Sequence, residues 1–192
     1  MSDQLIQRWL NHGDERAAEA LYDMHHARIY RLAYALLGDA QDAEEVMQDT
    51  MVYALTRTDL YDARKAAFTT WLHTITVSRC RDRKRRKRLP RIPLTSGPDG
   101  NSQVADGTRG PEATAILHEN RTELWQALQE LSPKLREAVV LRYWSGHTYH
   151  EIAQILHCPL PTAQSRVRLA YEQLRKLLWP TGVPALGGEN LR

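Results

Sequence analysis

The clearest pattern of apolar and polar positions lies between residues 132 and 178, where it predicts three successive helices. Ser132 and Pro133 suit the cap and the first position of a helix, and Gly146 suits the stop that follows it. Between them, apolar residues recur at helical spacing. The first of the three helices is therefore expected to end at Gly146.

Two further helix starts follow. Thr148, with Glu151 three residues later, predicts a capping box that opens a short second helix. A third helix is expected to begin near Pro159, and its apolar positions follow steps of three and four residues: Leu160, Ala163, Val167, Ala170, Leu174 and Leu177. Two helices joined by a tight turn form the helix-turn-helix pattern, whose second helix can lie in the major groove of DNA.

The polar face of the third helix supplies candidate DNA contacts. Opposite the apolar stripe lie Pro161, Ser165, Arg168 and Glu172, with Thr162, Gln164 and Leu169 beside them. Arg166, Arg175 and Lys176 flank this face and are better placed for phosphates. The alternative is a three-helix packing unit with a solvated basic face.

The first part of the chain also reads as helical. Core residues recur at helical spacing from residue 14 to Leu37, and Gly38 supplies a stop. Asp39 or Asp42 then opens an acidic helix that runs to Leu55. The pattern places polar residues on its outer side: Asp42, Glu45, Gln48 and Asp49. This side either docks a basic partner or is simply a solvated face.

A third helix of this part joins aromatic residues to a basic run. After a polar connection at 57–67, apolar spacing restarts at Phe68 and continues into residues 79–91, which hold nine Lys or Arg and one Asp. Aromatic residues that can stack on bases, followed along a helix by cations, suit single-stranded or melting DNA. Phe68 and Trp71 sit at core spacing and are expected to be buried supports, whereas Tyr61 lies in the connection and is freer to meet a base.

Residues 90–111 change composition to Pro, Gly, Ser, Asn and Asp, which predicts a flexible linker. The predicted fold is therefore all-α, with two small helical domains joined by that linker and a helix-turn-helix in the second. The predicted boundaries are 8–88 for the first domain, 89–114 for the linker, 115–178 for the second domain and 179–192 for a tail.

Composition excludes several classes of protein. The chain has 192 residues, 42% of them apolar, and no signal peptide or long apolar run, so we expect a cytoplasmic protein without membrane insertion. Cys80 and Cys158 do not suggest a disulfide framework. No catalytic constellation is evident, so no enzyme activity and no cofactor are predicted. A zinc set would need His147, His150, His157 and Cys158, but their spacing matches no familiar zinc motif, and no metal is predicted.

Taken in order, the motifs resemble the extracytoplasmic-function (ECF) group of bacterial RNA polymerase sigma factors. The resemblance rests on DAEEVMQD at 42–49, FTTWL at 68–72 running to Arg81 and Asp82, and LSP at 131–133 followed by YHEIA at 149–153 and TAQSR at 162–166. It covers nearly all of residues 14–178. It implies binding to core RNA polymerase and to promoter DNA, together with an anti-sigma factor as partner.

The resemblance also assigns roles to residues. The acidic helix is expected to bind a coiled coil of the largest (β′) subunit through Asp42, Glu45, Gln48 and Asp49. The first domain is expected to melt and read the minus-ten element through Tyr61, Trp71, Ser78, Arg81, Arg85 and Arg86. The second is expected to contact the β flap and to read the minus-thirty-five element through Thr162, Gln164, Ser165, Arg166 and Arg168.

This chain departs from its relatives at both DNA-reading positions. Ser78 stands where relatives commonly have Asn, and the third helix carries Pro161, Ala163 and Gln164 where they usually have Gly, Val and Lys. Arg168, opposite the apolar stripe, is therefore predicted to take over much of the base reading. The alternative function is a stand-alone helix-turn-helix regulator, which would leave the acidic stripe and the aromatic-to-basic helix without a joint purpose.

Overall fold

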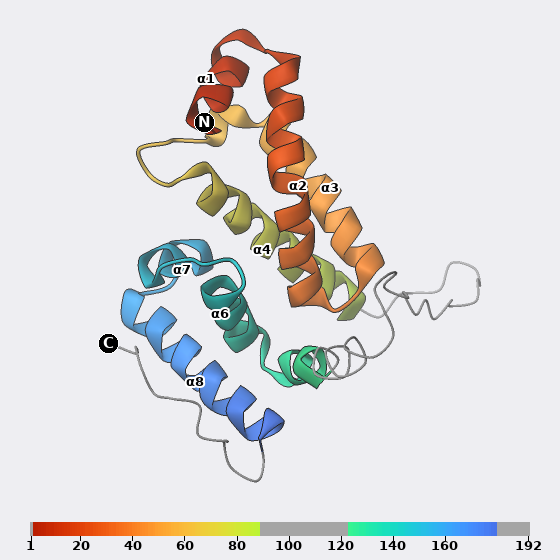
Figure 1. Ribbon diagram of the computed structural model, residues 1–192, viewed down its shortest axis with the longest axis vertical. Coiled ribbons are helices and arrows are strands. Elements are labelled where there is room, and N and C mark those ends of the chain that lie inside the picture. The colour runs from red at the N-terminus through yellow and green to blue at the C-terminus, as the bar shows by residue number, and fades with distance from the viewer. Residues whose placement is uncertain (1, 89–122, 180–192) are drawn as a thin grey trace, which may run out of the picture.

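A computed structural model of the chain describes residues 2–88 and 123–179 (Figure 1). Within these ranges every regular element is a helix, as predicted. The helices are α1 (Ser2–His12), α2 (Glu15–Leu37), α3 (Ala40–Thr56), the short 3-10 helix η1 (Thr58–Leu60), α4 (Phe68–Arg88), α6 (Pro133–Tyr143), α7 (Tyr149–Leu156) and α8 (Leu160–Leu178). A further helical segment covers residues 123–130.

The first domain, residues 2–88, packs α1 to α4 around one core. Gly38 ends α2 with a φ of 75°, and the Asp39 side chain accepts a hydrogen bond from the N–H of Asp42, so Asp39 rather than Asp42 caps α3. The core gathers the buried apolar side chains of all four helices: Ile6, Leu21, Ile29, Met47, Met51, Ala54, Phe68 and Leu72.

Helix α1 is not among the helices predicted from the sequence. Its Ile6 is buried against the core, and the indole N–H of Trp9 donates to the carbonyl of Leu55 at 3.1 Å. The spacing of Leu5, Ile6 and Trp9 was the signal that could have revealed it. The first domain therefore begins before the predicted start at residue 8.

The second domain, residues 123–179, contains the three helices that the sequence predicts, although α6 ends at Tyr143 rather than at Gly146 and the Ser132 side chain makes no cap hydrogen bond. The Thr148 hydroxyl accepts from the N–H of Glu151, and the Glu151 carboxylate accepts from the N–H of Thr148, which completes the capping box. His157 ends α7 in the left-handed region, with a φ of 51°. The apolar stripe of α8 is buried at Ala163, Val167 and Ala170 but reaches the surface at Leu177.

The two domains pack against each other and share a hydrophobic core, a feature that the sequence does not predict. Figure 1 shows α4 lying between α2 and α3 on one side and α6 and α7 on the other. Across this interface the rings of Tyr34 and Trp125 meet edge to face, with centroids 5.0 Å apart. The predicted linker, together with Ile116, Leu117 and the tail beyond residue 179, lies outside the described residues.

Arg136 joins the two domains from within. It is buried on α6, and its guanidinium donates to backbone carbonyls of both domains: those of Leu128, Gln129 and Leu131 in the second and that of Leu36 in the first. The bond to Leu36 is 3.0 Å long. The Arg136 side chain therefore hydrogen-bonds to backbone carbonyls near the C-terminal end of the 123–130 helical segment and at the C-terminal end of α2.

Candidate functional site

The outer face of α3 exposes Glu45, Gln48 and Asp49 in a row, as predicted. The side chain of Asp49 is 67% exposed and that of Glu45 is 44% exposed. Val52 continues the row and is 62% exposed, although the sequence analysis did not select it. Its spacing of three residues from Asp49 was the available signal. The face is thus an acidic and amide stripe with an apolar residue at one end.

Asp42 lies on the same side of α3 but is covered by α4, contrary to the expectation that it is exposed there. Its side chain is only 6% exposed and meets Arg83 at 2.8 Å and Lys87 at 2.5 Å, both on α4. Burial alone would raise the pKa of this carboxyl, but Lys87 and Arg83 outweigh burial, and the pKa is lowered. Asp42 therefore fastens α3 to the basic end of α4.

Much of the basic run on α4 is paired with carboxylates. Arg79 lies 3.9 Å from Asp49, Arg83 lies 2.5 Å from Glu45, and Arg85 lies 3.0 Å from Asp82. Ion pairs as exposed as these contribute little to stability and exchange readily with other partners. The same arginines can therefore exchange their carboxylate partners for other anions such as phosphates, and Arg86 is exposed.

Tyr61, Phe68 and Trp71 form an aromatic cluster at the start of α4. Ring centroids lie 5.2 Å apart for Tyr61 and Phe68, 5.3 Å for Tyr61 and Trp71 and 5.6 Å for Phe68 and Trp71. Phe68 is buried as predicted, and Trp71 is half-buried. Tyr61 is less free than predicted, because it packs on this cluster. The cluster presents aromatic surface beside the 57–67 loop.

The loop before α4 is shaped by its own charges. Arg64 donates from its guanidinium to both carboxylate oxygens of Asp62, each at 3.0 Å, and its backbone N–H also donates to Asp62. The Arg64 side chain and backbone hydrogen bonds lower the pKa of Asp62 to about 2. Asp62 therefore stays ionised at physiological pH and holds the turn.

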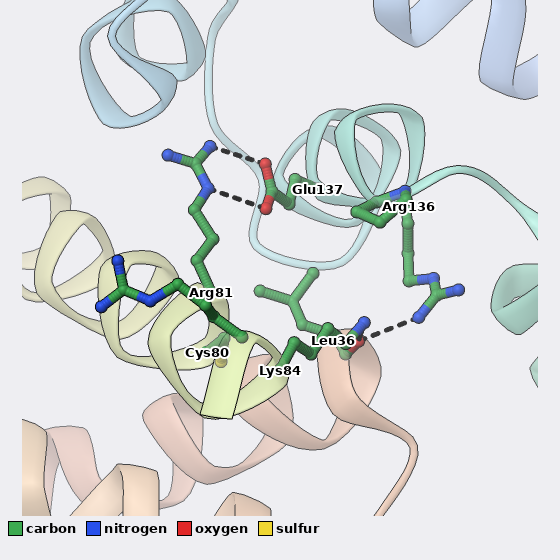
Figure 2. A pocket seen from close by; sticks show the side chains of 8 residues that line it. Leu36, Cys80, Arg81, Lys84, Arg136 and Glu137 are labelled. Carbon is green, nitrogen blue, oxygen red and sulfur yellow. Dashed lines mark hydrogen bonds and ion pairs between the residues drawn. The ribbon is translucent and has the colours of Figure 1, made fainter. Parts of the chain in front are cut away.

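Ser78 and Arg81 lie on α4 in different surroundings. Ser78 is exposed, whereas Arg81 makes a two-pronged contact with Glu137 of the second domain, at 2.9 Å from Nε and 2.6 Å from Nη2. Figure 2 shows the two side chains pointing toward one another between α4 and α6. A cavity of about 310 Å³ adjoins them and is also lined by Cys80, whose burial raises the pKa of its thiol to about 12.

On α8 the candidate DNA contacts differ in exposure. Gln164 and Arg168 are exposed, and Thr162, Ser165 and Arg166 are partly buried. The Arg168 side chain is 70% exposed and lies 3.5 Å from Glu172, one turn further along. A salt bridge this exposed leaves the guanidinium available for a ligand.

The histidines around the helix-turn-helix do not come together. His147 is buried and faces His73 of α4, while His150 and His157 are exposed. Among residues 2–88 and 123–179, no group of three or more His, Cys, Asp or Glu side chains is arranged to hold a metal ion. In the same ranges no helix has the length and apolar character needed to span a membrane.

An apolar groove on the second domain was not anticipated. Its volume is about 200 Å³, and it is lined by Leu124, Leu128, Val139, Val140, Tyr143, Trp144, Tyr171 and Leu174. Tyr143, Trp144 and Tyr171 are each about half exposed. Apolar surface of this kind, gathered in one place, marks an interaction site.

Comparisons with known families and proteins agree with one another. The family model for Sigma-70 region 2 matches residues 21–89, and that for Sigma-70 region 4 matches residues 121–174. The chain is 32% identical to the ECF RNA polymerase sigma factor SigW of Bacillus subtilis, over 86% of this chain and 91% of SigW. It is 30% identical to the RNA polymerase sigma-H factor of Pseudomonas aeruginosa, over 92% of this chain and 93% of that protein.

Solved structures share the fold. CnrH, solved in complex with the cytosolic domain of CnrY, superposes with a TM-score of 0.67 at 23% identity, over 95% of this chain and 100% of CnrH. The sigma factor RpoE of Bartonella quintana, solved with the anti-sigma factor NepR, gives 0.62 at 24% identity, over 85% and 98%. A stand-alone helix-turn-helix regulator would not account for the match of the first domain to Sigma-70 region 2. The chain therefore belongs to the ECF group of RNA polymerase sigma factors, which direct the initiation of transcription at promoters.

Proposed function

We propose that this sigma factor binds core RNA polymerase through the outer face of α3 and promoter DNA through α4 and α8, with no covalent chemistry of its own. Residues 8–88, together with the start of α1 before them, would form the polymerase-binding and minus-ten domain, residues 89–114 the linker and residues 115–178 the minus-thirty-five domain. The observation that carries this proposal is the coexistence of an exposed acidic face on α3 with exposed cations on two separate helices.

For the polymerase contact we narrow the candidate residues to Glu45, Gln48 and Asp49, with Val52 added. Asp42 is left out because Arg83 and Lys87 already occupy its carboxylate. An exposed stripe of carboxylates suits the basic surface of a coiled coil, and the apolar side chain of Val52 at its end adds apolar area that is dehydrated on binding. The β′ coiled coil is the partner that the family resemblance implies.

Asp49→Lys is expected to remove co-elution with core RNA polymerase, because a reversed charge meets a partner surface of the same sign. We expect a loss of affinity of at least about tenfold, which corresponds to about 1.4 kcal/mol. The measurement is size-exclusion chromatography of the full chain with core polymerase. Glu19→Lys, an equal charge change on the exposed side of α2, is the matched control and should co-elute like the unaltered chain. Unchanged co-elution of Asp49→Lys would refute the assignment.

The minus-ten contact combines the aromatic cluster with the basic face of α4. Turning a base out of the stack costs on the order of a few kcal/mol, which stacking and polar contacts must offset. Tyr61 and Trp71 offer the aromatic surface, and Ser78 offers a hydroxyl further along the helix. The cations proposed to hold the phosphates of the separated strands are Arg81, Arg85 and Arg86.

The minus-thirty-five contact lies on α8, where Thr162, Gln164, Ser165, Arg166 and Arg168 are proposed to face the major groove. Arg168→Ala is expected to cost about 1–3 kcal/mol of discrimination for the upstream element, because an arginine that contacts guanine reads one base pair. The measurement is the affinity of holoenzyme for duplexes with the mapped element or a scrambled one. Arg175→Ala, a candidate phosphate contact on the same helix, should weaken both duplexes equally. If Arg168→Ala lost the same affinity for both duplexes, Arg168 would instead be a phosphate contact.

Two protein contacts complete the proposal. The apolar groove of the second domain supplies a surface for the predicted contact with the β flap, since an amphipathic helix can lay its apolar side in such a groove. CnrH and RpoE were each solved with a protein partner, and the partner of RpoE is an anti-sigma factor. An anti-sigma factor is accordingly proposed for this chain.

A further inference from the structure

The packed arrangement of the two domains cannot be the arrangement that reads a promoter. The two elements lie about 25 base pairs apart, which is about 85 Å of B-form DNA at 3.4 Å per step. In the structure the domains share a core, and Arg81, a candidate DNA contact, is held by Glu137. A chain as long as residues 89–122 reaches about 110 Å when fully extended, so separation of the domains is possible. The protein must therefore open, and the contacts between domains set how readily it does so.

One of these contacts joins two buried histidines. Nδ1 of His73, on α4, lies 2.6 Å from Nε2 of His147, in the turn before α7. Each residue is only 4% exposed, and the two rings meet edge to face with centroids 4.8 Å apart. One ring nitrogen must donate and the other accept, which two neutral imidazoles can arrange. Two imidazolium rings cannot, because both nitrogens would then be donors and both rings would be positive.

We propose that the domain interface is a proton-operated latch, closed when His73 and His147 are neutral and released when both take up protons. The pair bridges the two domains. A single protonated ring still donates to its neutral neighbour, so protonation of both rings is what breaks this contact, which belongs only to the closed form. The proposal goes beyond polymerase and promoter binding and concerns the isolated chain.

The groups that face the pair favour the neutral form. Helix α2 contributes His25, Arg28 and Arg31, the two arginines lining the same cavity as His73. From α6, Arg142 donates to the backbone carbonyl of His147 at 3.0 Å. The nearby carboxylate is that of Glu151, on α7, 3.6 Å from Nδ1 of His147; it is shared with Thr70 and with the capping box.

Burial and these neighbours lower both pKa values in the closed form. Burial is the main cause at His73, followed by the positive charges of His147, His25 and Arg28, and its pKa falls to about 3. Burial also lowers the pKa of His147, although Glu151 opposes the change. In water each would titrate near about 6.5. The closed form is thus favoured fully above about pH 6.5 and loses its advantage as the pH falls below that value.

The expected size follows from the same pKa values. Between pH 7.5 and pH 5.5 the ratio of closed to open chain should fall about tenfold through His73 alone, and further through His147, whose pKa is also lowered in the closed form. The measurement is small-angle X-ray scattering of the full chain across this range, with circular dichroism to verify that the helices persist. We expect the radius of gyration to grow as the pH falls while helix content stays constant.

Variants separate this pair from the other histidines. His73→Gln and His147→Gln each keep a polar side chain that does not titrate, so the pH dependence should shrink in either variant, by about tenfold in His73→Gln. His150→Gln, on the exposed side of α7, is the matched control and should behave like the unaltered chain. A radius of gyration that stays constant for the unaltered chain overturns the latch, as does a pH response that both pair variants retain. Neither result bears on polymerase binding, which the Asp49→Lys experiment tests separately.

Discussion

Replacing Arg136 by alanine is expected to lower the free energy of unfolding by about 3–5 kcal/mol, the largest loss predicted for any single side chain here. The guanidinium is buried and donates to the carbonyls of Leu36, Leu128, Gln129 and Leu131. Each buried acceptor left without a donor costs about 1–3 kcal/mol, less whatever water regains on entering the space. Equilibrium unfolding in urea, followed by circular dichroism, measures the loss.

Two further variants identify the cause of that loss. Arg136→Met fills much of the volume but donates no hydrogen bond, so it should remain strongly destabilised if the carbonyls are the reason. Lys134→Ala lies on the exposed side of the same helix and should change stability by no more than about 0.5 kcal/mol. Near-native stability of Arg136→Met would show that packing, rather than hydrogen bonding, is the contribution of Arg136.

Replacing Leu72 by alanine is expected to destabilise the first domain by about 2–5 kcal/mol, because the lost side chain leaves a cavity that the helices cannot close. Leu72 has no exposed surface and lies in the core that Phe68 and Met51 also form. That core supports the aromatic cluster proposed to receive a base. Thermal unfolding of the full chain gives the loss of stability.

The matched control is another leucine of the same domain. Leu60, in η1, is 48% exposed, and Leu60→Ala should change stability by no more than about 0.5 kcal/mol. If the two leucine variants unfold at the same temperature, the core assignment of Leu72 is wrong. Transcription from an artificially pre-melted promoter should restore part of the activity that Leu72→Ala loses, because strand separation is then already supplied.

Helix boundaries were predictable because the interactions that fix them are local. The capping box of Thr148 and Glu151 spans three residues, and Gly38 ends α2 through its own backbone conformation. The same holds for Pro159, after which α8 begins. Each of these signals is complete within one turn of the chain, so no knowledge of the tertiary structure was needed to interpret it.

Asp42 shows where this kind of reasoning fails. A helical projection correctly puts Asp42 on the same side as Glu45 and Asp49, but it carries no information about which helix lies alongside. Arg83 and Lys87, about forty residues further along the chain, lie against Asp42 and cover its carboxylate. One end of the outer face of α3, at Asp42, is consequently covered by α4, and the other end stays exposed.

The contacts between the domains could not be predicted from the sequence for the same reason. Arg81 and Glu137 are 56 positions apart, and His73 and His147 are 74 apart. Neither member of either pair is unusual in its own segment: Arg81 reads as one more cation of a basic run, and His147 as a polar turn residue. Their meaning depends on a packing geometry that periodicity cannot supply.

The polar character of these contacts also bears on how safely the molecule can come apart. When the domains part, Arg81, Glu137 and the two histidines return to water, which hydrates such groups well. The domains also share a hydrophobic core, so parting exposes apolar surface as well, and the polar contacts reduce the share of the interface that is apolar. A smaller exposed apolar area lowers the tendency of the opened chains to aggregate. The polar contacts at the domain interface can thus break and re-form repeatedly, as an initiation factor that is used more than once requires.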